Sequence, residues 1–362
     1  MSQLRVAVLL AVDKSFATLS YLHGWPRGLA ADPRLTCTFV NTLDPDRRLR
    51  NRWILRQCDA IVMLHSVFSQ GNLLRGDLAA LIKRTTKPKA WFIGNEYKLM
   101  PEKMAFGEEF GINVLVSQIL AEPVLDLYRE RLGCNVVAIP NTGFDPSVFA
   151  PGPPLADRPI DIGYRAFDTP WYVGYRDRAV LAETFTRTRM AGLRVDVSID
   201  PNDRFDETGW ATFLQSCKVQ LGCEAGTDFF ELDDHTRLGV NAYLDEHPNA
   251  TFDDVAERFF LEYPSPVSGR TISGRVIEAA ATKTPQVLLE GAYGGLFQPG
   301  EHYISLQRDF ENLDDVLTQL ADLDRCERLA EAAFEVASAR CTYNALITPL
   351  LAEIEKVARQ TS

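Results

Sequence analysis

The amino-acid sequence predicts an α/β protein made of two doubly wound parallel-sheet domains that face each other across a cleft. Three observations lead to this prediction. Short apolar runs alternate with longer mixed segments, which is typical of βαβ units in a parallel sheet. A proline-rich stretch, Phe149–Asp157, interrupts this alternation, which then starts again. The length of 362 residues also suggests about two domains rather than one.

The first domain is expected to span residues 1–150 and to be Rossmann-like. Its first strand is predicted at Leu4–Val12, where valine and leucine predominate as in a strand buried on both faces. Helical segments are predicted at Leu73–Lys83 and Val124–Leu132. Five further strands are predicted at Thr36–Val40, Ala60–Leu64, Ala90–Ile93, Asn113–Val116 and Asn135–Ile139.

The second domain is expected to span residues 158–342 and to repeat this pattern. Its strands are predicted at Ile160–Gly163, Arg194–Ile199, Lys218–Leu221, Pro285–Leu289 and Tyr303–Leu306. Its helices are predicted at Arg178–Arg189, Trp210–Ser216, Gly274–Thr282 and Leu313–Asp322. The segment Asp228–Ser268 interrupts the rhythm and should form two helices of its own, and a last helix is expected at Tyr343–Arg359 with one apolar face.

Composition limits the classes of function. A hydrophobic fraction of 46% and a charged fraction of 24% are those of an average soluble globular protein. The net charge of −11 argues against nonspecific nucleic-acid binding, which needs a basic face. The apolar run Val6–Val12 is far too short to span a bilayer, and no cleavage pattern follows it, so we expect a cytoplasmic protein with no integral membrane segment. We also expect no basic amphipathic helix, and hence no tight attachment to a membrane.

Candidate binding residues follow the predicted strands of the second domain, because ligands bind beyond the carboxyl ends of parallel strands. Arg165 follows the first of these strands and Glu224 follows the third. The loop after the fourth strand supplies four more candidates, namely Glu290, Gly291, Tyr293 and Gly294. Glycine-rich loops after strands are also common as simple turns, so this pattern has a structural alternative.

The helix predicted near Gly274 offers a second group of candidates. Ser273, Gly274 and Arg275 stand at its N-terminus, where free backbone N–H groups favour a diphosphate. Arg165 could add a bidentate contact to the same group. Glu278, one turn later, suits the vicinal hydroxyls of a ribose. The structural alternative is a solvated arginine and a glutamate that only favours the helix.

In the first domain, His65 and Glu96 each follow a predicted strand and are the candidates for proton transfer, although either can be structural. No paired aspartates follow a strand and no histidines cluster, so we expect neither a metal nor another cofactor. The seven cysteines show no zinc-site spacing, and their odd number argues against a disulfide framework.

The segment Ile272–Leu306 resembles the donor-binding end of GT-B glycosyltransferases, particularly the bacterial family-four-like group that contains the spore-maturation-type glycosyltransferase-like proteins. The similar sequence motifs are a Gly-Arg-x-x-Glu-Ala helix, a glycine-rich loop and the segment Pro299–Leu306. Upstream, Ile139–Pro146 resembles the phrase that ends the first domain in this group, and Lys218–Gly226 resembles a segment of an uncharacterised bacterial subset.

This resemblance implies a retaining transfer of a sugar from a UDP- or GDP-type donor to an acceptor hydroxyl. It places the donor in the second domain and the acceptor mainly in the first, and it implies that the final helix, within residues 343–362, crosses back to the first domain. It assigns the donor ribose to Glu278. Many relatives carry another glutamate eight positions earlier, where this chain has Arg270. The candidates for holding the sugar are then Glu224 and the Glu290–Gly295 loop.

Two alternatives remain open at the level of sequence. A nucleotide-sugar epimerase or hydrolase shares the same architecture and would turn over the donor without an acceptor. A catalytically inactive scaffold subunit is the other alternative, and the arginine at position 270 is the feature that favours it.

Overall fold

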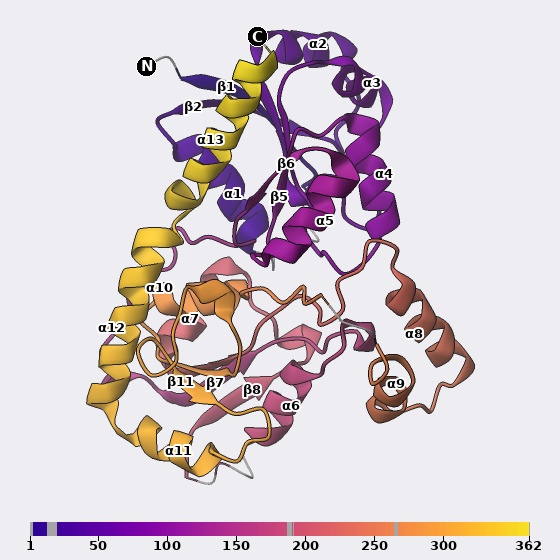
Figure 1. The fold of residues 1–362 in the computed structure, drawn as a ribbon. Coiled ribbons are helices and arrows are strands. Elements are labelled where there is room, and N and C mark those ends of the chain that lie inside the picture. Colours follow the sequence, from indigo (N-terminus) through magenta and orange to yellow (C-terminus); the bar gives the residue numbers. More distant parts are fainter. Residues whose placement is uncertain (1–2, 13–19, 187–189, 191, 264–266, 362) are drawn as a thin grey trace.

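A computed structural model describes residues 3–12, 20–186, 190, 192–263 and 267–361. It contains two parallel β-sheets, one above the other in Figure 1, with helices on both faces of each. The architecture confirms the predicted fold class of two doubly wound parallel-sheet domains. The last strand of the first sheet ends at Ala138, and the first strand of the second sheet begins at Ile160.

The first sheet has six strands in the order β2-β1-β3-β4-β5-β6. The strand bounds are β1 Leu4–Leu10, β2 Leu35–Asn41, β3 Ala60–Met63, β4 Lys89–Phe92, β5 Val114–Ser117 and β6 Asn135–Ala138. The helices are α1 Ser20–Ala31, α2 Arg48–Gln57, α3 Gly76–Arg84, α4 Met100–Phe110 and α5 Glu122–Leu132. Alternate residues of β1 enter different cores, since Ala7 and Leu9 pack on one face and Val6 and Val8 on the other.

The second sheet has five strands in the order β11-β10-β9-β7-β8. The strand bounds are β7 Ile160–Arg165, β8 Val195–Ser198, β9 Cys217–Gly222, β10 Gln286–Leu289 and β11 Ile304–Leu306. The helices are α6 Asp177–Thr184, α7 Glu207–Ser216, α10 Gly274–Ala281, α11 Leu313–Ala321 and α12 Leu323–Arg340. Helix α6 is shorter than predicted, and residues 187–189 of the predicted helix lie outside the described residues. The strand order reverses between β7 and β9, which is where such sheets bind ligands.

The last helix, α13 (Tyr343–Thr361), returns to the first sheet along the side of the molecule (Figure 1). Its inner face is buried against β1 and its neighbours. The residues on that face are Tyr343, Leu346, Ile347, Leu350, Leu351, Ile354 and Val357. The first domain therefore takes part of its core from the end of the chain.

The segment that interrupts the second domain forms α8 (His235–Glu246) and α9 (Phe252–Phe259), which project to one side in Figure 1. Thr251 caps α9 in a capping box with Asp254. This segment also contacts the first domain, because the Asp234 carboxylate accepts hydrogen bonds from the amides of Leu99 and Met100 at the start of α4, at 2.7 and 3.2 Å. Phe230 enters the core of the first domain.

Helix α2 differs from what the sequence analysis expects, because it is a basic helix with one buried and one exposed face. Asn51, Ile54 and Leu55 are buried, whereas Leu49 and Trp53 are exposed. The expectation that the chain lacks a basic amphipathic helix is therefore wrong. No helix in the described part of the chain is both long and apolar enough to cross a membrane.

Candidate active site

A cavity of about 240 Å³ lies between the two domains, at the carboxyl ends of β7 and β9. We call it the interdomain pocket. Its floor is formed by Arg165 at the end of β7, Gly226 after β9 and the first turn of α10. The opposite side of the pocket is formed by the first domain, with the residues Tyr21, Asn95, Tyr97, Gln118, Asn141 and Thr142.

Three arginines other than Arg165 line this pocket: Arg178, Arg204 and Arg275. Arg178, at the start of α6, is only 6% exposed, and its Nε and Nη1 atoms have no hydrogen-bond partner within the described structure. Its guanidinium lies 4.5 Å from the centre of the Phe167 ring, and that of Arg204 lies 5.7 Å from the same ring. A buried guanidinium with unsatisfied N–H groups is costly unless an anion completes it.

Arg275 stands in the first turn of α10, beside the helix N-terminus. Burial lowers its pKa, and the nearby positive charge of Arg178 lowers it further. The two guanidiniums are thus close enough to repel each other. Backbone N–H groups in a first helical turn lack intrahelical acceptors, so this corner of the pocket offers donors and positive charge together.

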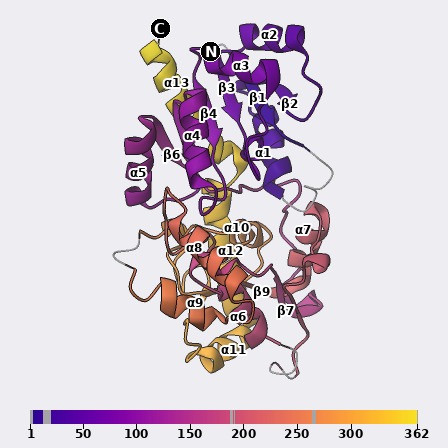
Figure 2. The same cartoon turned by 90° about the vertical axis from the view of Figure 1, so that its right-hand side faces the viewer.

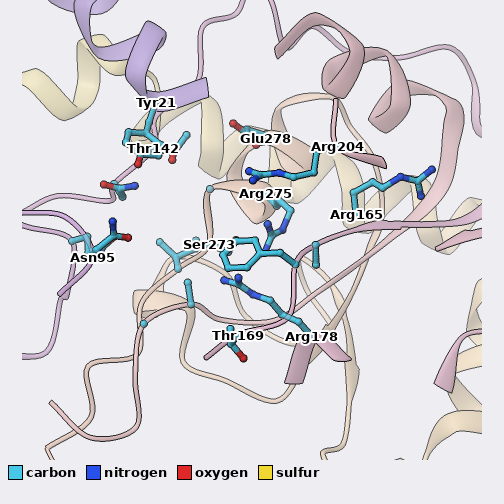
Figure 3. Close-up of a pocket in the computed structure, with 18 of the residues that line it drawn as sticks. Tyr21, Asn95, Thr142, Arg165, Thr169, Arg178, Arg204, Ser273, Arg275 and Glu278 are labelled. Atoms are coloured by element: carbon cyan, nitrogen blue, oxygen red, sulfur yellow. The ribbon is translucent and has the colours of Figure 1, made fainter. Parts of the chain in front are cut away.

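Glu278 lies one turn further along α10 and is buried at the pocket wall. Its Oε2 atom accepts a hydrogen bond of 2.7 Å from the indole Nε1 of Trp210 on α7. This contact fixes the carboxylate at the pocket wall. Figure 3 shows Glu278 above the side chains of Arg204 and Arg275.

Arg165 also lines the pocket, but its guanidinium is directed away from the other arginines (Figure 3). It forms an ion pair of 2.7 Å with Asp196 and donates to the carbonyls of Tyr164, Asp196 and Asp203. It also lies 4.6 Å from the centre of the Phe213 ring. These partners belong to the second domain itself, so Arg165 has fewer donors left for a ligand than Arg178 has.

The N-terminus of α10 touches the first domain at Gly274. A Cβ atom at this position would lie 2.5 Å from Thr142 Oγ1, a distance that no real side chain adopts. Only glycine therefore lets Thr142 approach the helix this closely. The neighbouring Thr271 hydroxyl donates a hydrogen bond of 2.6 Å to the carbonyl of Gln118, which also joins the two domains. Ser273 is buried at the same junction and lines the pocket.

Three other candidates lie in a separate, open groove at the ends of β9 and β10. Glu224, Glu290 and Gly291 line this groove, together with Arg270. Burial raises the pKa of Glu224, whose Oε1 accepts a hydrogen bond of 2.8 Å from the amide of Tyr293. The predicted sugar-contacting residues are thus not brought together with Arg275 and Glu278 in the interdomain pocket.

Arg270, the residue that the sequence analysis compares with a glutamate of the resembled group, is held by acidic neighbours. It forms ion pairs with Asp177 at 2.6 Å and with Asp228 at 2.5 Å. Arg308 also pairs with Asp177, at 2.9 Å. Asp177 precedes Arg178, so this network anchors the turn that presents Arg178 to the interdomain pocket.

Tyr293 and Gly294 line neither the interdomain pocket nor the groove. Tyr293 is fully buried, and its hydroxyl donates to the carbonyl of Leu289 at 2.5 Å. Gly294 adopts a φ of 62°, and a Cβ there would lie 2.3 Å from Leu120 of the first domain. These positions shape the loop after β10.

The first-domain candidates are both buried behind the pocket wall. Glu96 is 1% exposed and accepts hydrogen bonds from the hydroxyls of Ser117 and Tyr128 at 2.8 and 2.6 Å. Burial raises the pKa of Glu96. His65 contacts the rings of Tyr21 and Phe92, and burial lowers its pKa to about 3. Neither side chain lines the interdomain pocket in the described structure.

Arg178, Arg204 and Trp210 are pocket residues that the sequence analysis does not single out. Arg178 lies in a predicted helix, and Arg204 and Trp210 lie around a predicted helix start, without a motif that marks them. The available signal is position alone, since Arg204 lies in the loop between β8 and α7 and Arg178 lies at the start of α6, the helix that follows β7. In the described part of the chain, no group of three or more histidine, cysteine, aspartate or glutamate side chains is placed to hold a metal ion.

Comparison with known proteins identifies the class of fold. No protein-family model matches the sequence, and no curated protein sequence matches it. The structure is similar to sucrose-phosphate synthase from Thermosynechococcus elongatus, with a TM-score of 0.55 and 13% sequence identity over 99% of this chain and 100% of that one.

Two further solved structures are similar over nearly their whole length. One is HepE from Anabaena in complex with UDP and glucose, with a TM-score of 0.50 and 10% identity over 97% of this chain and 100% of that one. The other is a glycosyltransferase from Rickettsia africae, with a TM-score of 0.50 and 10% identity over 99% of both chains. These likenesses show that the chain has the GT-B fold.

Proposed function

We propose that this protein is a glycosyltransferase that moves a sugar from a nucleoside-diphosphate sugar to an acceptor hydroxyl. The observation that carries this proposal is the set of three arginines, Arg178, Arg204 and Arg275, around the start of α10 in the interdomain pocket. A diphosphate supplies the anionic oxygens that the unsatisfied N–H groups of Arg178 lack. Solved proteins of the same fold include a glycosyltransferase and a complex with UDP and glucose, which supports this choice of donor.

Glu278 is the proposed ligand of the donor ribose. An ionised carboxylate accepts two hydrogen bonds from vicinal hydroxyls, and the Trp210 indole holds this one in place. Arg178, Arg204 and Arg275 then bind the diphosphate on the same side of the pocket. UDP is the nucleotide proposed first, because it is the one bound in a similar structure.

The catalytic contribution of these arginines is electrostatic. As the bond between the sugar carbon and the diphosphate oxygen breaks, negative charge grows on the departing diphosphate. Guanidiniums and helix N–H groups that are fixed in advance stabilise that charge without reorganising. The acceptor hydroxyl forms the new bond to the same sugar carbon, and its proton passes to the departing phosphate oxygen.

Retention at the sugar carbon is part of the proposal. A base that drives attack from the opposite face is expected to come from the first domain, because the resemblance places the acceptor mainly there. The described first-domain residues that line the pocket are tyrosine, asparagine, glutamine and threonine, none of which is a base at neutral pH. Transfer of the proton to the donor's own phosphate therefore suits this site, and it leads to attack on the face that the diphosphate leaves.

Calorimetry followed by a transfer assay tests the proposal. UDP and GDP are titrated into the protein beside the matching nucleosides, and a labelled UDP-sugar is then supplied with a panel of sugar and lipid alcohols. The expected result is that the diphosphate binds far more tightly than the nucleoside, and that label moves only when an acceptor is present. Turnover of the donor without any acceptor would instead support an epimerase or hydrolase. A protein that binds no nucleoside diphosphate contradicts the proposal.

A further inference from the structure

Helix α2 carries an unusual combination of exposed side chains. Leu49 is 83% exposed and Trp53 is 61% exposed, and Leu43 just before the helix is 45% exposed. Leu49 and Trp53 are four residues apart, so they lie side by side on one face. Arg52 and Arg56 continue the same stripe, at three and seven residues from Leu49. The outward face of α2 is therefore both apolar and basic.

The charge of α2 is opposite to that of the whole chain. The protein has 49 acidic residues and 38 lysines and arginines. The helix itself contains four arginines and no acidic residue, and a fifth arginine precedes it; they are Arg47, Arg48, Arg50, Arg52 and Arg56. Among the described residues, only Arg48 of this set forms an ion pair, with Asp77 at 3.2 Å.

The helix is already formed and fixed with this face outward. Ile54 and Leu55 are buried in the core of the first domain. The Lys87 ammonium donates to the carbonyl of Leu55 at 2.6 Å and also to that of Cys58, so it caps the C-terminal end of α2. Trp53 and Leu49 cannot turn inward without losing these contacts.

We propose that α2 docks the protein on an anionic lipid surface. Arginines attract acidic head groups, while Trp53 and Leu49 enter the boundary between head groups and acyl chains. A tryptophan with an apolar body and a polar N–H suits this boundary particularly well. A polyanion such as RNA would also bind the arginines, but unlike a lipid bilayer it has no apolar interior into which an exposed leucine could be buried. Figures 1 and 2 both place α2 at the end of the first domain farthest from the second, where a flat surface can reach it.

Sedimentation of the full chain with lipid vesicles tests this proposal. One set of vesicles contains phosphatidylcholine alone, and the other contains phosphatidylcholine with phosphatidylglycerol. The expected result is that the protein sediments with the phosphatidylglycerol vesicles and stays in solution with the neutral ones. Added salt should weaken binding, because it screens the arginines.

Two double variants separate the apolar and the basic contributions. Leu49→Ala with Trp53→Ala should lower the partition coefficient roughly tenfold or more, because two large apolar side chains no longer enter the lipid. Arg52→Gln with Arg56→Gln should lower it about 25-fold, at roughly fivefold for each charge. The matched controls are Leu261→Ala, at a leucine that is 77% exposed elsewhere, and Arg340→Gln on α12. Both controls should bind like the wild type.

Each double variant must also keep the circular-dichroism spectrum and nucleotide affinity of the wild type, which shows that the fold is intact. Equal binding to neutral and anionic vesicles would overturn the proposal. So would two folded variants that bind vesicles like the wild type. A short single-stranded RNA provides the last arm of the test. If the protein binds it as tightly as the vesicles, and the Leu49 and Trp53 variant binds both unchanged, the partner is a polyanion and the lipid proposal is wrong.

Discussion

Replacing Arg178 with methionine should move stability and nucleotide affinity in opposite directions. In the free protein, two N–H groups of this buried guanidinium have no partner in the described structure. Leaving such groups unsatisfied costs roughly 1–3 kcal/mol, and methionine removes them while it still packs on the Phe167 ring. The lost attraction between the cation and the ring is worth about 0.5–2 kcal/mol. The net gain is therefore about 1 kcal/mol, or roughly 1–2 °C in Tm for a chain of this length.

The same substitution should weaken UDP. A hydrogen bond to a charged group contributes roughly 1.5–3 kcal/mol, so the Kd for UDP should rise about ten- to hundredfold. Uridine lacks the phosphates and should bind the variant and the wild type equally. Thermal unfolding gives the stability of the free protein, and calorimetry gives both affinities.

Arg165→Met is the matched control, because Arg165 lines the same pocket but is satisfied by Asp196 and by backbone carbonyls. This variant should lose stability, by roughly 1–3 kcal/mol, and should change UDP binding less than Arg178→Met does. If the Arg178 variant is less stable than the wild type and binds UDP equally well, Arg178 is a structural residue and the pocket is not a diphosphate site.

Three further predictions follow from the same structure. Glu278→Gln keeps the shape of the side chain but removes its charge, so uridine and UDP should both bind about tenfold more weakly in calorimetry, and an unchanged affinity for uridine would contradict the ribose assignment. Gly274→Ala should reduce UDP affinity, because the new Cβ meets the Thr142 side chain, and Thr142→Gly should restore it; a single variant that binds normally would show that the junction tolerates a methyl group. His65→Leu should flatten the loss of stability in acid, measured by urea unfolding across pH. The pKa of His65 is lowered to about 3, so the unfolded chain takes up its proton first as pH falls below about 6.5, and the native state loses up to about 1.4 kcal/mol per pH unit. A wild type and variant with the same pH profile would contradict that reasoning.

The fold could be predicted largely because its strands are buried on both faces. The run Val6–Leu10 in β1 and the whole of β3 are continuously apolar, and this pattern can be recognised without knowing which strands lie beside them. Helix α2 could not be found in this way, because Leu49 and Trp53 point outward and obscure the periodicity that marks an ordinary surface helix.

The residues of the candidate site could be predicted only where a short stretch of sequence is enough to indicate what they bind. Arg275 and Glu278 stand near a helix N-terminus, so their spacing alone indicates a place for an anion and a ribose. Arg178 becomes a pocket residue through contacts with Phe167 and through an anchor at Asp177, whose partner Arg308 is far away in sequence. Glu96 shows the opposite limit, because a carboxylate after a strand resembles a reactive group until its hydrogen-bond partners are known.

The return of α13 to the first sheet has a consequence for how the protein is made. A chain that has left the ribosome only as far as Arg340 contains every strand of both sheets, yet one face of the first sheet still lacks the helix that covers it. Domains usually fold in the order in which they are synthesised. Here the domain that is translated first is completed last, because its core waits for side chains such as Ile347, Leu350 and Ile354. Until then its apolar face is open to chaperones and to other nascent chains, so a stop codon shortly before Tyr343 disables the first domain although it leaves the sequence of that domain untouched.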